Sequence, residues 1–447
     1  MNQRKPKLSL IMKMFSGTNF LKIVMKKCKI YLFSAALLTG VAAFAEFQYV
    51  NDNMAFYDPD LLADSDVNVS IDSIDNSDAL QVMAGGFLVD LNSVTSTVNN
   101  VNTPSAEFYA GNAWGDIKGD VRTEISNSSF KIVFGGSLAS SQVGFDASGN
   151  IGGSTYLTFN SGFVSGSIAG GSNLSYQHKG NIGGSTNLTI NGGTIGGNVV
   201  AGGINYGGVS ETNTSTSANL LINASNPANK ISIGGYVCGI MNDGHERTEK
   251  VSIIFTGNGE NLDFTGTVSS IQADSYSSST TWYASANERV ISFGSGEDAF
   301  VGQFNGTINN GKIAGQNQFN ELKIGKDSSV EFTQDFDLNV DTLSIFSNAE
   351  VLGNATITVD DALNIFISDS FSGTDLVFEL GESIVLSAES QSNVSILHED
   401  GSLFDGAEFA YDPITNSFAI SNIPESSTYA SIFGALALAF AAYRRRK

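Results

Sequence analysis

The sequence predicts an all-β protein whose body is a right-handed parallel β-helix, flanked by an N-terminal signal helix and a C-terminal transmembrane helix. Two observations predict the body. Short alternating runs of Val, Ile, Phe and Thr recur between Gly, Asn, Ser and Asp turns, and helix-length periodic segments occur only at the two termini. The 447 residues also include 48 Gly and only 6 Pro, so the turns rely on glycine conformations and few residues interrupt a hydrogen-bond ladder.

The chain divides by composition into five segments. They are a signal peptide, an acidic N-terminal cap region, a glycine-rich repeat solenoid, an acidic and strand-rich C-terminal part of the solenoid, and a sorting tail. Residues 1–24 add further cations and contain Met12 and Met14, so Met12, Met14 and Met25 are alternative starts of the chain. In order, the segments span residues 1–45, 46–110, 111–310, 311–422 and 423–447.

The first segment has the layout of a secretory signal peptide. Residues 26–29 are basic apart from one Cys, residues 30–41 are mostly apolar, and Ala43 and Ala45 form a small-residue cleavage site. We expect cleavage after Ala45, which makes Glu46 the first residue of the mature chain.

Charge is distributed unevenly along the chain. The formal net charge is −22 at pH 7, yet the first 45 residues hold eight Lys or Arg and no acid, and the last four residues are all cations. Without these twelve cations, 11 basic residues stand against 45 acidic ones, a balance of about −34. Such a balance disfavours nucleic acid and anionic membranes as partners. It favours solubility, divalent cations or cationic partners, and a solvated acidic surface without a ligand is the simpler interpretation.

The acidic cap region is rich in aspartate. Its close pairs, Asp58 with Asp60 and Asp64 with Asp66, offer the oxygen ligands that Ca²⁺ prefers. The sequence has neither the spacing of an EF-hand nor the nonapeptide of calcium-binding β-rolls, so a solvated or partly disordered lead-in is the preferred interpretation. No metal or cofactor is therefore predicted. The eight aspartates are Asp52, Asp58, Asp60, Asp64, Asp66, Asp72, Asp75 and Asp78.

An internal repeat with a period of about 31 to 34 residues predicts stacked coils. Residues 115–125 align with residues 149–159 and 180–190, and a fainter copy contains Asn219, which corresponds to Asn187. One coil cannot bury its apolar side until a neighbour covers it, so repeats of this length stack into a solenoid. The predicted inward residues are Ile151, Leu157, Phe159, Ile182, Leu188 and Ile190.

A second, weaker repeat predicts that the solenoid continues. Residues 257–268 resemble residues 294–308, so that Gly257 corresponds to Gly294 and Thr267 to Thr307. Further strands follow from residue 322 onward, and they are more acidic and contain less glycine. The chain before the tail ends in a predicted hairpin, with residues 409–412 and 417–420 as its strands.

Cysteine usage predicts a fold without an intramolecular disulfide. Cys28 leaves with the signal peptide, and Cys238 is then alone in the exported chain. Residues 233–239 echo residues 195–203 of the preceding repeat. This placement predicts that Cys238 is a small inward hydrophobe rather than a reactive thiol.

The last segment has the composition of a membrane-spanning tail. Residues 429–443 carry no charge and as a helix would rise about 22 Å, short of the roughly 30 Å hydrocarbon core. Tyr429 and Tyr443 suit the membrane interface, and the cations that follow can reach cytoplasmic headgroups. We therefore expect a transmembrane helix with the body outside. A buried or amphipathic helix is the alternative, although four cations directly after an apolar run fit core packing poorly.

The whole tail resembles the tripartite PEP-CTERM sorting signal of Gram-negative bacteria, which combines a Pro-Glu-Pro motif, an apolar helix and an Arg-rich end. The motif here is Pro424, Glu425 and Ser426, with Ser in place of the second Pro. The resemblance covers about 25 of the 447 residues. It implies an exosortase-type sorting enzyme, which is a membrane cysteine transpeptidase-like protein, as a partner. The basic end consists of Arg444, Arg445, Arg446 and Lys447.

The resemblance also implies a route. The export machinery is then a second partner, the chain is anchored in the inner membrane during sorting, and its destination is the cell surface or the extracellular matrix. The resemblance concerns sorting alone and implies no catalytic residue and no fold for the body.

Catalytic motifs are scarce. His178, His245 and His398 are isolated in the sequence, which has no His-Glu-x-x-His, Gly-x-Ser-x-Gly or Walker motif. Residues 243–247 bring Asp, His, Glu and Arg together, the residue types that general acid–base chemistry on a sugar requires. A polar loop has the same composition, so no catalytic residue is assigned.

The sequence therefore favours an exported cell-surface or extracellular-matrix protein, structural or adhesive and non-enzymatic. Its Asn-, Thr- and Ser-rich face is expected to contact extracellular polysaccharide, like copies of the chain or host surfaces. The alternative is a secreted polysaccharide-active β-helix enzyme, a lyase or hydrolase, which convergent carboxylates in a groove would indicate. The repeat body resembles autotransporter passengers, but the apolar, Arg-rich end disfavours a conventional autotransporter.

Overall fold

The computed structural model describes most of the body of the chain. The chain divides into two units, Met1–Ala43 and Phe44–Lys447, and every described residue lies in the second. The predicted signal peptide and sorting tail fall outside the described residues. These are residues 47–51, 54–57, 64–72, 81–86, 89–113, 115–140, 149–175, 180–205, 213–242, 246–273, 286–313, 315–369 and 371–423.

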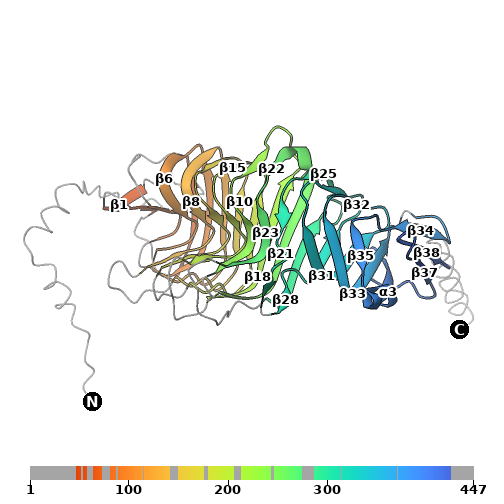
Figure 1. Ribbon diagram of the computed structural model, residues 1–447. Helices are drawn as coiled ribbons and strands as arrows, with labels where there is room; N and C mark the ends of the chain where they lie inside the picture. The colour runs from red at the N-terminus through yellow and green to blue at the C-terminus, as the bar shows by residue number, and fades with distance from the viewer. Residues whose placement is uncertain are drawn as a thin grey trace, which may run out of the picture. The chain divides into compact units, whose positions relative to one another are not determined.

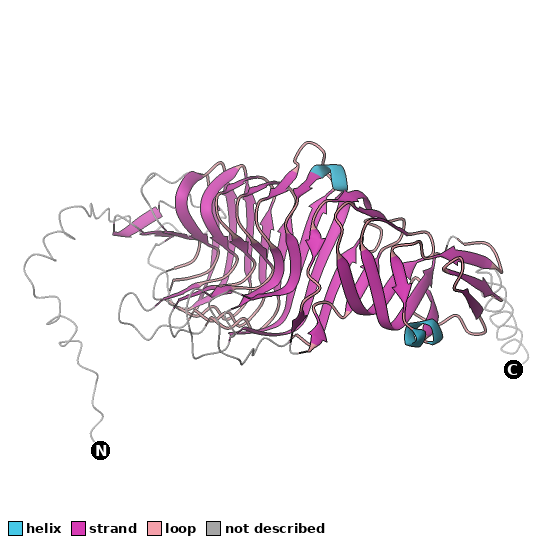
Figure 2. Ribbon diagram, viewed as in Figure 1, coloured by secondary structure: helices cyan, strands magenta, loops and turns pink. Residues whose placement is uncertain are grey.

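Two large sheets of mainly parallel strands make up the described body, as predicted for an all-β chain with β-helix-like pairing (Figures 1 and 2). Sheet A has 17 described strands: β1 (Phe47–Asn51), β2 (Met54–Tyr57), β4 (Gln81–Met83), β6 (Asn102–Tyr109), β8 (Ser128–Phe134), β9 (Leu138–Ser140), β11 (Gly162–Val164), β12 (Ile168–Ala169), β13 (Asn173–Ser175), β15 (Gly193–Ile195), β16 (Val199–Val200), β17 (Ile204–Asn205), β19 (Ile231–Ile233), β20 (Val237–Asn242), β22 (Leu262–Phe264), β23 (Thr267–Ala273) and β26 (Thr307–Ile308). Sheet B has 16: β3 (Ser65–Ile71), β5 (Leu91–Asn99), β7 (Val121–Ser126), β10 (Thr155–Phe159), β14 (Thr186–Ile190), β18 (Asn213–Ala224), β21 (Glu246–Asn258), β24 (Glu288–Phe293), β25 (Phe300–Phe304), β29 (Glu321–Ile324), β30 (Ser329–Phe332), β31 (Asp337–Phe346), β32 (Glu350–Gly353), β33 (Thr356–Ile367), β35 (Ile384–Leu386) and β36 (Val394–His398).

Successive coils pair in register. Leu157 pairs with Leu188, and Leu188 pairs with Leu220 on the coil after that. Asn187 and Asn219 are partners in the same ladder, and β7 pairs with β10 in the register of the sequence alignment. Residues that correspond in the repeat are thus paired in the sheet, which confirms the repeat as the unit of stacking. In Figure 1 these strands follow one another in chain order.

Stacking already begins within the predicted cap region. Val67 of β3 pairs with Val94 of β5, and Val94 pairs with Val121 of β7, so these coils are shorter than those of the glycine-rich repeat. On sheet A, β4 pairs with β6 and β6 pairs with β8 in the same way. Parallel pairing therefore crosses residue 110, the boundary drawn from composition.

Turn side chains join one coil to the next. The backbone N–H of Asn150 donates to Asp116 Oδ1 at 3.0 Å, and the N–H of Asn181 donates to Asn150 Oδ1 at 3.1 Å. Likewise, the N–H of Ser185 donates to Ser154 Oγ at 3.0 Å. Turns cannot complete their hydrogen bonding within one coil, so short polar side chains of the neighbouring coil accept from them.

The correspondence that the second repeat predicts is confirmed at its second half and is wrong at its first half. Thr267 pairs with Thr307, as the repeat predicts. Gly257, however, pairs with Phe300 and not with Gly294. The reason is a turn closed by reciprocal backbone hydrogen bonds between Ser295 and Asp298, which lengthens this coil after β24.

The coils between β29 and β33 are shorter, a feature that the repeats do not predict, and the last coil, in which Leu363 pairs with Val394, is long again. Leu322 pairs with Leu343 and Leu343 with Leu363. Val330 of β30 likewise pairs with Val351 of β32. The inward positions of sheet B stay aligned across this change, although the β31–β33 ladder has one register shift, between Val340 and Thr342.

Inward side chains of both sheets form the main core. The six predicted inward residues are all buried, with exposed fractions of 5% or less, which confirms the prediction. Aromatic rings fill the middle of the stack: the ring centroid of Phe304 lies 5.2 Å from that of Phe255, 5.1 Å from Phe293 and 5.9 Å from Phe332. Edge-to-face contacts of this kind add to the stabilisation from burial.

A smaller core lies beside the main one. Cys238 pairs with Val200, which pairs with Ala169, and that residue pairs with Phe134. These residues pack together with the ring of Tyr109, stacked 5.0 Å from Phe134. Cys238 is fully buried, so the prediction that it points inward is confirmed.

A small antiparallel sheet follows the last coil. It comprises β34 (Leu376–Glu379), β38 (Ser417–Ser421) and β37 (Glu408–Asp412), and the β37–β38 pair is the predicted hairpin. Phe378 and Phe418 of this sheet belong to the main core, so the sheet covers apolar side chains of the last coils. The remaining described elements are β27 (Lys312–Ile313), β28 (Gln316–Asn317), η1 (Gly259–Asn261) and α3 (Ala388–Ser392).

Both described helices are single turns (Figure 2). Within the ranges given above, no helix has the length and apolar character that crossing a membrane requires. The predicted transmembrane segment, residues 429–443, lies outside those ranges.

The aromatic cluster predicts the cost of a core truncation. Phe304→Ala removes a fully buried ring from contact with four others, so we expect the free energy of unfolding to fall by about 3–5 kcal/mol. Urea denaturation measures this value. Phe163→Ala, at a ring that is 41% exposed, is the control and should cost about 1 kcal/mol or less. Equal losses in the two variants would contradict the proposed packing.

Candidate functional site

The outer face of sheet B is organised in three columns of side chains. Each column collects one position per coil, related by the strand register, and in most strands alternates with the buried positions. In β24 the column residues Val290 and Ser292 are themselves buried. The first column is Asn68, Thr95, Arg122, Tyr156, Asn187, Asn219, Ser252, Val290, Glu321 and Thr342. The second column is Ser70, Thr97, Glu124, Thr158, Thr189, Leu221, Ile254, Ser292, Lys323, Ser344, Asn364 and Ser395.

The third column lies at the end of the same strands and changes character along the stack. It begins with amides and hydroxyls, continues through two glycines and ends in apolar side chains. In order its residues are Asn99, Ser126, Asn160, Asn191, Asn223, Thr256, Gly294, Gly325, Phe346, Phe366 and Leu397.

Amide side chains of the columns hydrogen-bond along the stack. Asn191 Nδ2 donates to Asn160 Oδ1 at 2.9 Å, and Asn223 Nδ2 donates to Asn191 Oδ1 at 3.1 Å. In the first column, Asn219 Nδ2 donates to Asn187 Oδ1 at 3.0 Å. Each bond joins neighbouring coils, so the polar face also holds the register of the stack.

The two glycines interrupt the third column. A Cβ atom on Gly325 would lie 2.9 Å from the carbonyl carbon of Gly294, and one on Gly294 would lie 3.2 Å from Gly325 Cα. Gly294 also has φ of +88°, which disfavours every residue with a side chain. Two neighbouring positions therefore stay without side chains, and the column has a gap between Thr256 and Phe346.

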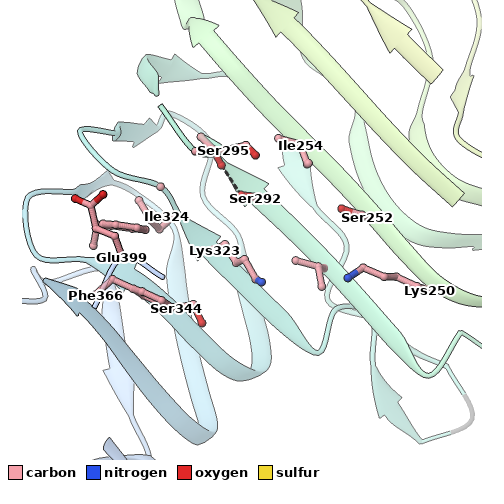
Figure 3. Close-up of a pocket in the computed structure, with 15 residues that line it drawn as sticks. Lys250, Ser252, Ile254, Ser292, Ser295, Lys323, Ile324, Ser344, Phe366 and Glu399 are labelled. Carbon is pink, nitrogen blue, oxygen red and sulfur yellow. Dashed lines mark hydrogen bonds between the residues drawn. The ribbon is translucent and has the colours of Figure 1, made fainter. Parts of the chain in front are cut away.

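A cavity of about 350 Å³ lies at this gap (Figure 3). The strands β21, β24, β29 and β31 contribute second-column side chains to it, and other residues of these strands and of β33 also line it. The turn after β24 and the loop after β36 contribute Ser295 and Glu399. Figure 3 shows Phe366 and Glu399 at one end and Lys250 and Ser252 at the other. The lining residues are Lys250, Ser252, Ile254, Val290, Ser292, Gly294, Ser295, Gly296, Lys323, Ile324, Gly325, Ser344, Phe346, Phe366 and Glu399.

Two aromatic rings form the apolar wall of the cavity. Phe346 and Phe366 stack with ring centroids 5.1 Å apart and an interplanar angle of 18°. Both side chains are half-buried although they occupy outward positions of sheet B. They are the residues that fill the third column directly beyond the glycines, so the rings stand where the gap ends.

The cations of the cavity are paired with carboxylates beside it. Lys323 Nζ lies 3.3 Å from Glu321 Oε2, and Lys250 pairs with Glu288. The hydroxyl of Ser344 donates to Glu321 Oε1 at 2.6 Å. The cavity thus presents both donors and acceptors with little excess charge of either sign.

Glu399 stands at the rim of the cavity and is held by three donors. Its Oε1 accepts from the Ser368 hydroxyl and the Asp369 N–H, both at 2.9 Å, and lies 3.1 Å from Lys326 Nζ. Burial by itself would raise the pKa of Glu399, but these hydrogen bonds and the ammonium charge outweigh burial and lower the pKa below its ordinary 4.5. The hydrogen bond to Glu399 in turn raises the pKa of Lys326.

Most residues singled out in the sequence lie outside the described part of the chain. This holds for the cleavage site, Ala43 and Ala45, and for the loop residues Asp243 and His245. Glu246 and Arg247 begin β21, but their side chains are not described. The sorting residues Pro424, Glu425, Ser426, Arg444, Arg445, Arg446 and Lys447 and the other histidine, His178, also lie outside.

The remaining candidates have structural contacts. His398 of β36 stacks on Phe404 with ring centroids 3.5 Å apart. Asp64 pairs with Lys118 at 2.8 Å, and Asp66 accepts from Asn92 at 2.8 Å and from Ser93. Asp52, Asp58, Asp60, Asp75 and Asp78 are not among the described residues. In the part that is described, no group of three or more His, Cys, Asp or Glu side chains is placed to hold a metal ion.

A carboxylate pair at another corner of sheet B was not anticipated. Asn317 Nδ2 donates to Asp341 Oδ1 at 2.7 Å and to Asp360 Oδ2 at 3.3 Å, and Asn320 donates to Asp341 Oδ2 at 2.9 Å. Buried Arg289 lies near Asp341, and its guanidinium donates mainly to backbone carbonyls, including that of Gln318 at 3.1 Å. Burial lowers the pKa of Arg289, and the charge of Asp341 opposes that shift.

The cavity itself carries one carboxyl group, that of Glu399, among its described lining residues. Glycoside hydrolysis ordinarily uses two carboxyl groups on either side of the bond. The hydroxyls, ammonium groups and rings suit binding instead, because they combine hydrogen-bonding groups with an apolar wall. No protein-family model, no curated protein and no solved structure matches this chain.

The contacts of Glu399 predict a pH-dependent effect. Because its pKa is lowered on folding, its stabilising contribution is present above pH 4.5 and is lost as the pH falls through the lower folded value. Glu399→Gln should therefore lower the unfolding midpoint by roughly 2 °C at pH 7, and by progressively less as the pH drops below 4.5.

Thermal unfolding followed by circular dichroism across this pH range measures the difference. Glu382→Gln, at an exposed carboxylate, is the matched control and should leave the midpoint unchanged at every pH. A loss in Glu399→Gln that stays constant with pH would contradict the assigned role of the carboxylate.

Proposed function

We propose that this chain is an exported cell-surface or extracellular-matrix protein, structural or adhesive and without catalytic activity. The carrying observation is the polar outer face of sheet B, on which Asn, Thr and Ser recur at equivalent positions of successive coils. Repetition at the spacing between strands suits contact with an extended partner, because the same group is offered again about every 4.7–4.9 Å. Extended concave or flat faces are what stacked-repeat proteins commonly use for binding.

We further infer that the body is a right-handed parallel β-helix. Support comes from the parallel pairing between the described strands of sheet B and from the main core that both sheets share. Right-handed connections between parallel strands of one sheet are the rule, because a right-twisted strand packs back on the sheet only that way. The signal helix and the transmembrane helix at its ends belong to this proposal.

The route of export follows from the sequence. We propose that the signal peptide ends at Ala45 and that the tail anchors the chain in the inner membrane. An exosortase-type enzyme then recognises Pro424, Glu425 and Ser426 and passes the body to the surface. Extracellular polysaccharide and like copies of the chain are the partners proposed there, and nucleic acid is not.

A second candidate function, polysaccharide cleavage, has one observation in its favour. Asp341 and Asp360 approach the same amide nitrogen of Asn317, so two carboxyl groups lie close together on the outside of the stack. Turnover of polysaccharide that is lost in both Asp341→Asn and Asp360→Asn would favour this alternative. Activity that neither variant affects would remove the pair from consideration.

The tail predicts where the mature chain ends. We expect intact-mass spectrometry of protein extracted from the cell surface to find a new C-terminus near Pro424, because sorting cleaves at the motif. Replacing Arg444, Arg445, Arg446 and Lys447 by Ala should reduce the surface fraction at least about fivefold, since these cations hold the tail on the cytoplasmic side.

Ser426→Pro is the matched variant for this experiment. It restores the Pro-Glu-Pro form of the motif, so it should be sorted at least as well as the natural chain. Surface protein that retains Lys447 would overturn the proposed route. So would a surface fraction that is unchanged when the four basic residues are replaced by Ala.

A further inference from the structure

We propose that the cavity between Thr256 and Phe346 on sheet B binds a neutral saccharide, with one pyranose ring lying in the glycine gap. This inference rests on the proposed function, because it names the class of ligand that the outer face of an exported protein would hold. The site is a cavity with an apolar wall at one end and hydroxyl and charged groups along its floor.

The glycines create the space. At every other described position of the third column a side chain stands beside the strand ends, whereas Gly294 and Gly325 contribute only backbone, so no side chain of theirs enters the cavity that they line. The resulting volume of about 350 Å³ is within the range of small-molecule sites. A ligand here would lie against the backbone of the two glycines, on the cavity side, and not in the directions of their absent side chains, which Ser328 Oγ and the Gly294 backbone already fill.

The aromatic wall gives the gap a preference for flat apolar surfaces. Phe346 and Phe366 line the cavity, are half-buried, and stack on each other 5.1 Å apart. A pyranose ring has one face of C–H groups that can lie against such a ring and displace water from it. Its hydroxyl groups then point sideways toward the floor.

The floor offers partners to hydroxyl groups. Ser252 of β21 and Ser295 of the turn after β24 carry hydroxyls that donate and accept, and Lys323 supplies a further donor. The Ser344 and Ser292 hydroxyls are already engaged, with Glu321 and with the Gly294 carbonyl. A saccharide matches this mixture because every one of its hydroxyls can act in both senses.

Charge selects a neutral ligand over an anionic one. Lys250 and Lys323 are balanced by Glu288 and Glu321, and Glu399 is balanced by Lys326. Among its described lining residues, the cavity therefore has no spare cation for a uronate or a phosphate. Beyond the cavity, the strongly acidic chain repels polyanions.

Binding is tested with defined probes on the full chain. The probes are reducing-end-labelled cellohexaose, maltohexaose and mannohexaose as neutral saccharides and hexagalacturonate as the anionic comparison, with fluorescence anisotropy as the measurement. We expect at least one neutral probe to bind, and Phe346→Ala to raise its Kd about tenfold because the stacking face is lost. Ser295→Trp, at an exposed turn residue, should abolish binding by filling the gap.

Controls separate the site from the fold. Phe163→Ala removes a ring that is 41% exposed on sheet A and should leave the Kd unchanged, and circular dichroism confirms that all variants are folded. No binding of any neutral probe, preferential binding of hexagalacturonate, or an unchanged Kd in both Phe346→Ala and Ser295→Trp each overturns the inference.

The two proposals fail separately. A chain that is found at the cell surface with a processed tail but binds no neutral probe leaves the proposed function standing and removes this site. A chain that binds a probe through Phe346 but never leaves the cytoplasm keeps the site and removes the proposed function.

Discussion

The parallel register between coils is the constraint on which the rest of this structure depends. A single coil presents an apolar side chain such as Leu188 toward the interior but cannot cover it, and the matching positions Leu157 and Leu220 on the neighbouring coils do so. A slip of one residue would turn every inward side chain of a strand outward. The columns of the outer face exist for the same reason, since one register places both the core and the surface.

Hydrogen bonds along the stack make that register specific. Turn N–H groups find their acceptors on the neighbouring coil, as Asn150 does on Asp116, and surface amides such as Asn191 bond to the coil before. Hydrophobic burial alone is non-directional and tolerates small shifts. The hydrogen bonds between coils do not tolerate such shifts, because a turn N–H group left without an acceptor costs the energy of a lost hydrogen bond. The same polar side chains of the outer face therefore hold the coils in register and face the proposed partner.

Coil length varies much more than the strand register, which shifts at only a few bulges, and the cavity arises from that difference. Coils are shorter at the N-terminal end and between β29 and β33 than in the glycine-rich repeat, and the last coil, from β33 to β36, is long again. Most of these changes fall in connections, and a bulge between Val340 and Thr342 takes up one residue within a strand. The turn at Ser295 and the loop at Glu399 both belong to such connections, and both reach the outer face of sheet B beside Gly294. The site is thus made by the loops that the repeat does not contain.

Local pattern in the sequence determined the strands, the glycine-rich repeat and the inward residues, because alternation and spacing directly encode which side chains face a neighbouring coil. The sequence also contains the repeat of the short coils between β29 and β33. Its three copies are residues 321–325, 342–346 and 362–366, and in their alignment Gly325 corresponds to Phe346 and Phe366. Only the tertiary structure decided that Gly294 and Gly325 become neighbours, that Glu399 lines the same cavity, and that Asp341 and Asp360 accept from the same amide of Asn317. These contacts join segments whose separation depends on loop lengths, and no local propensity specifies how a loop crosses the face of a stack.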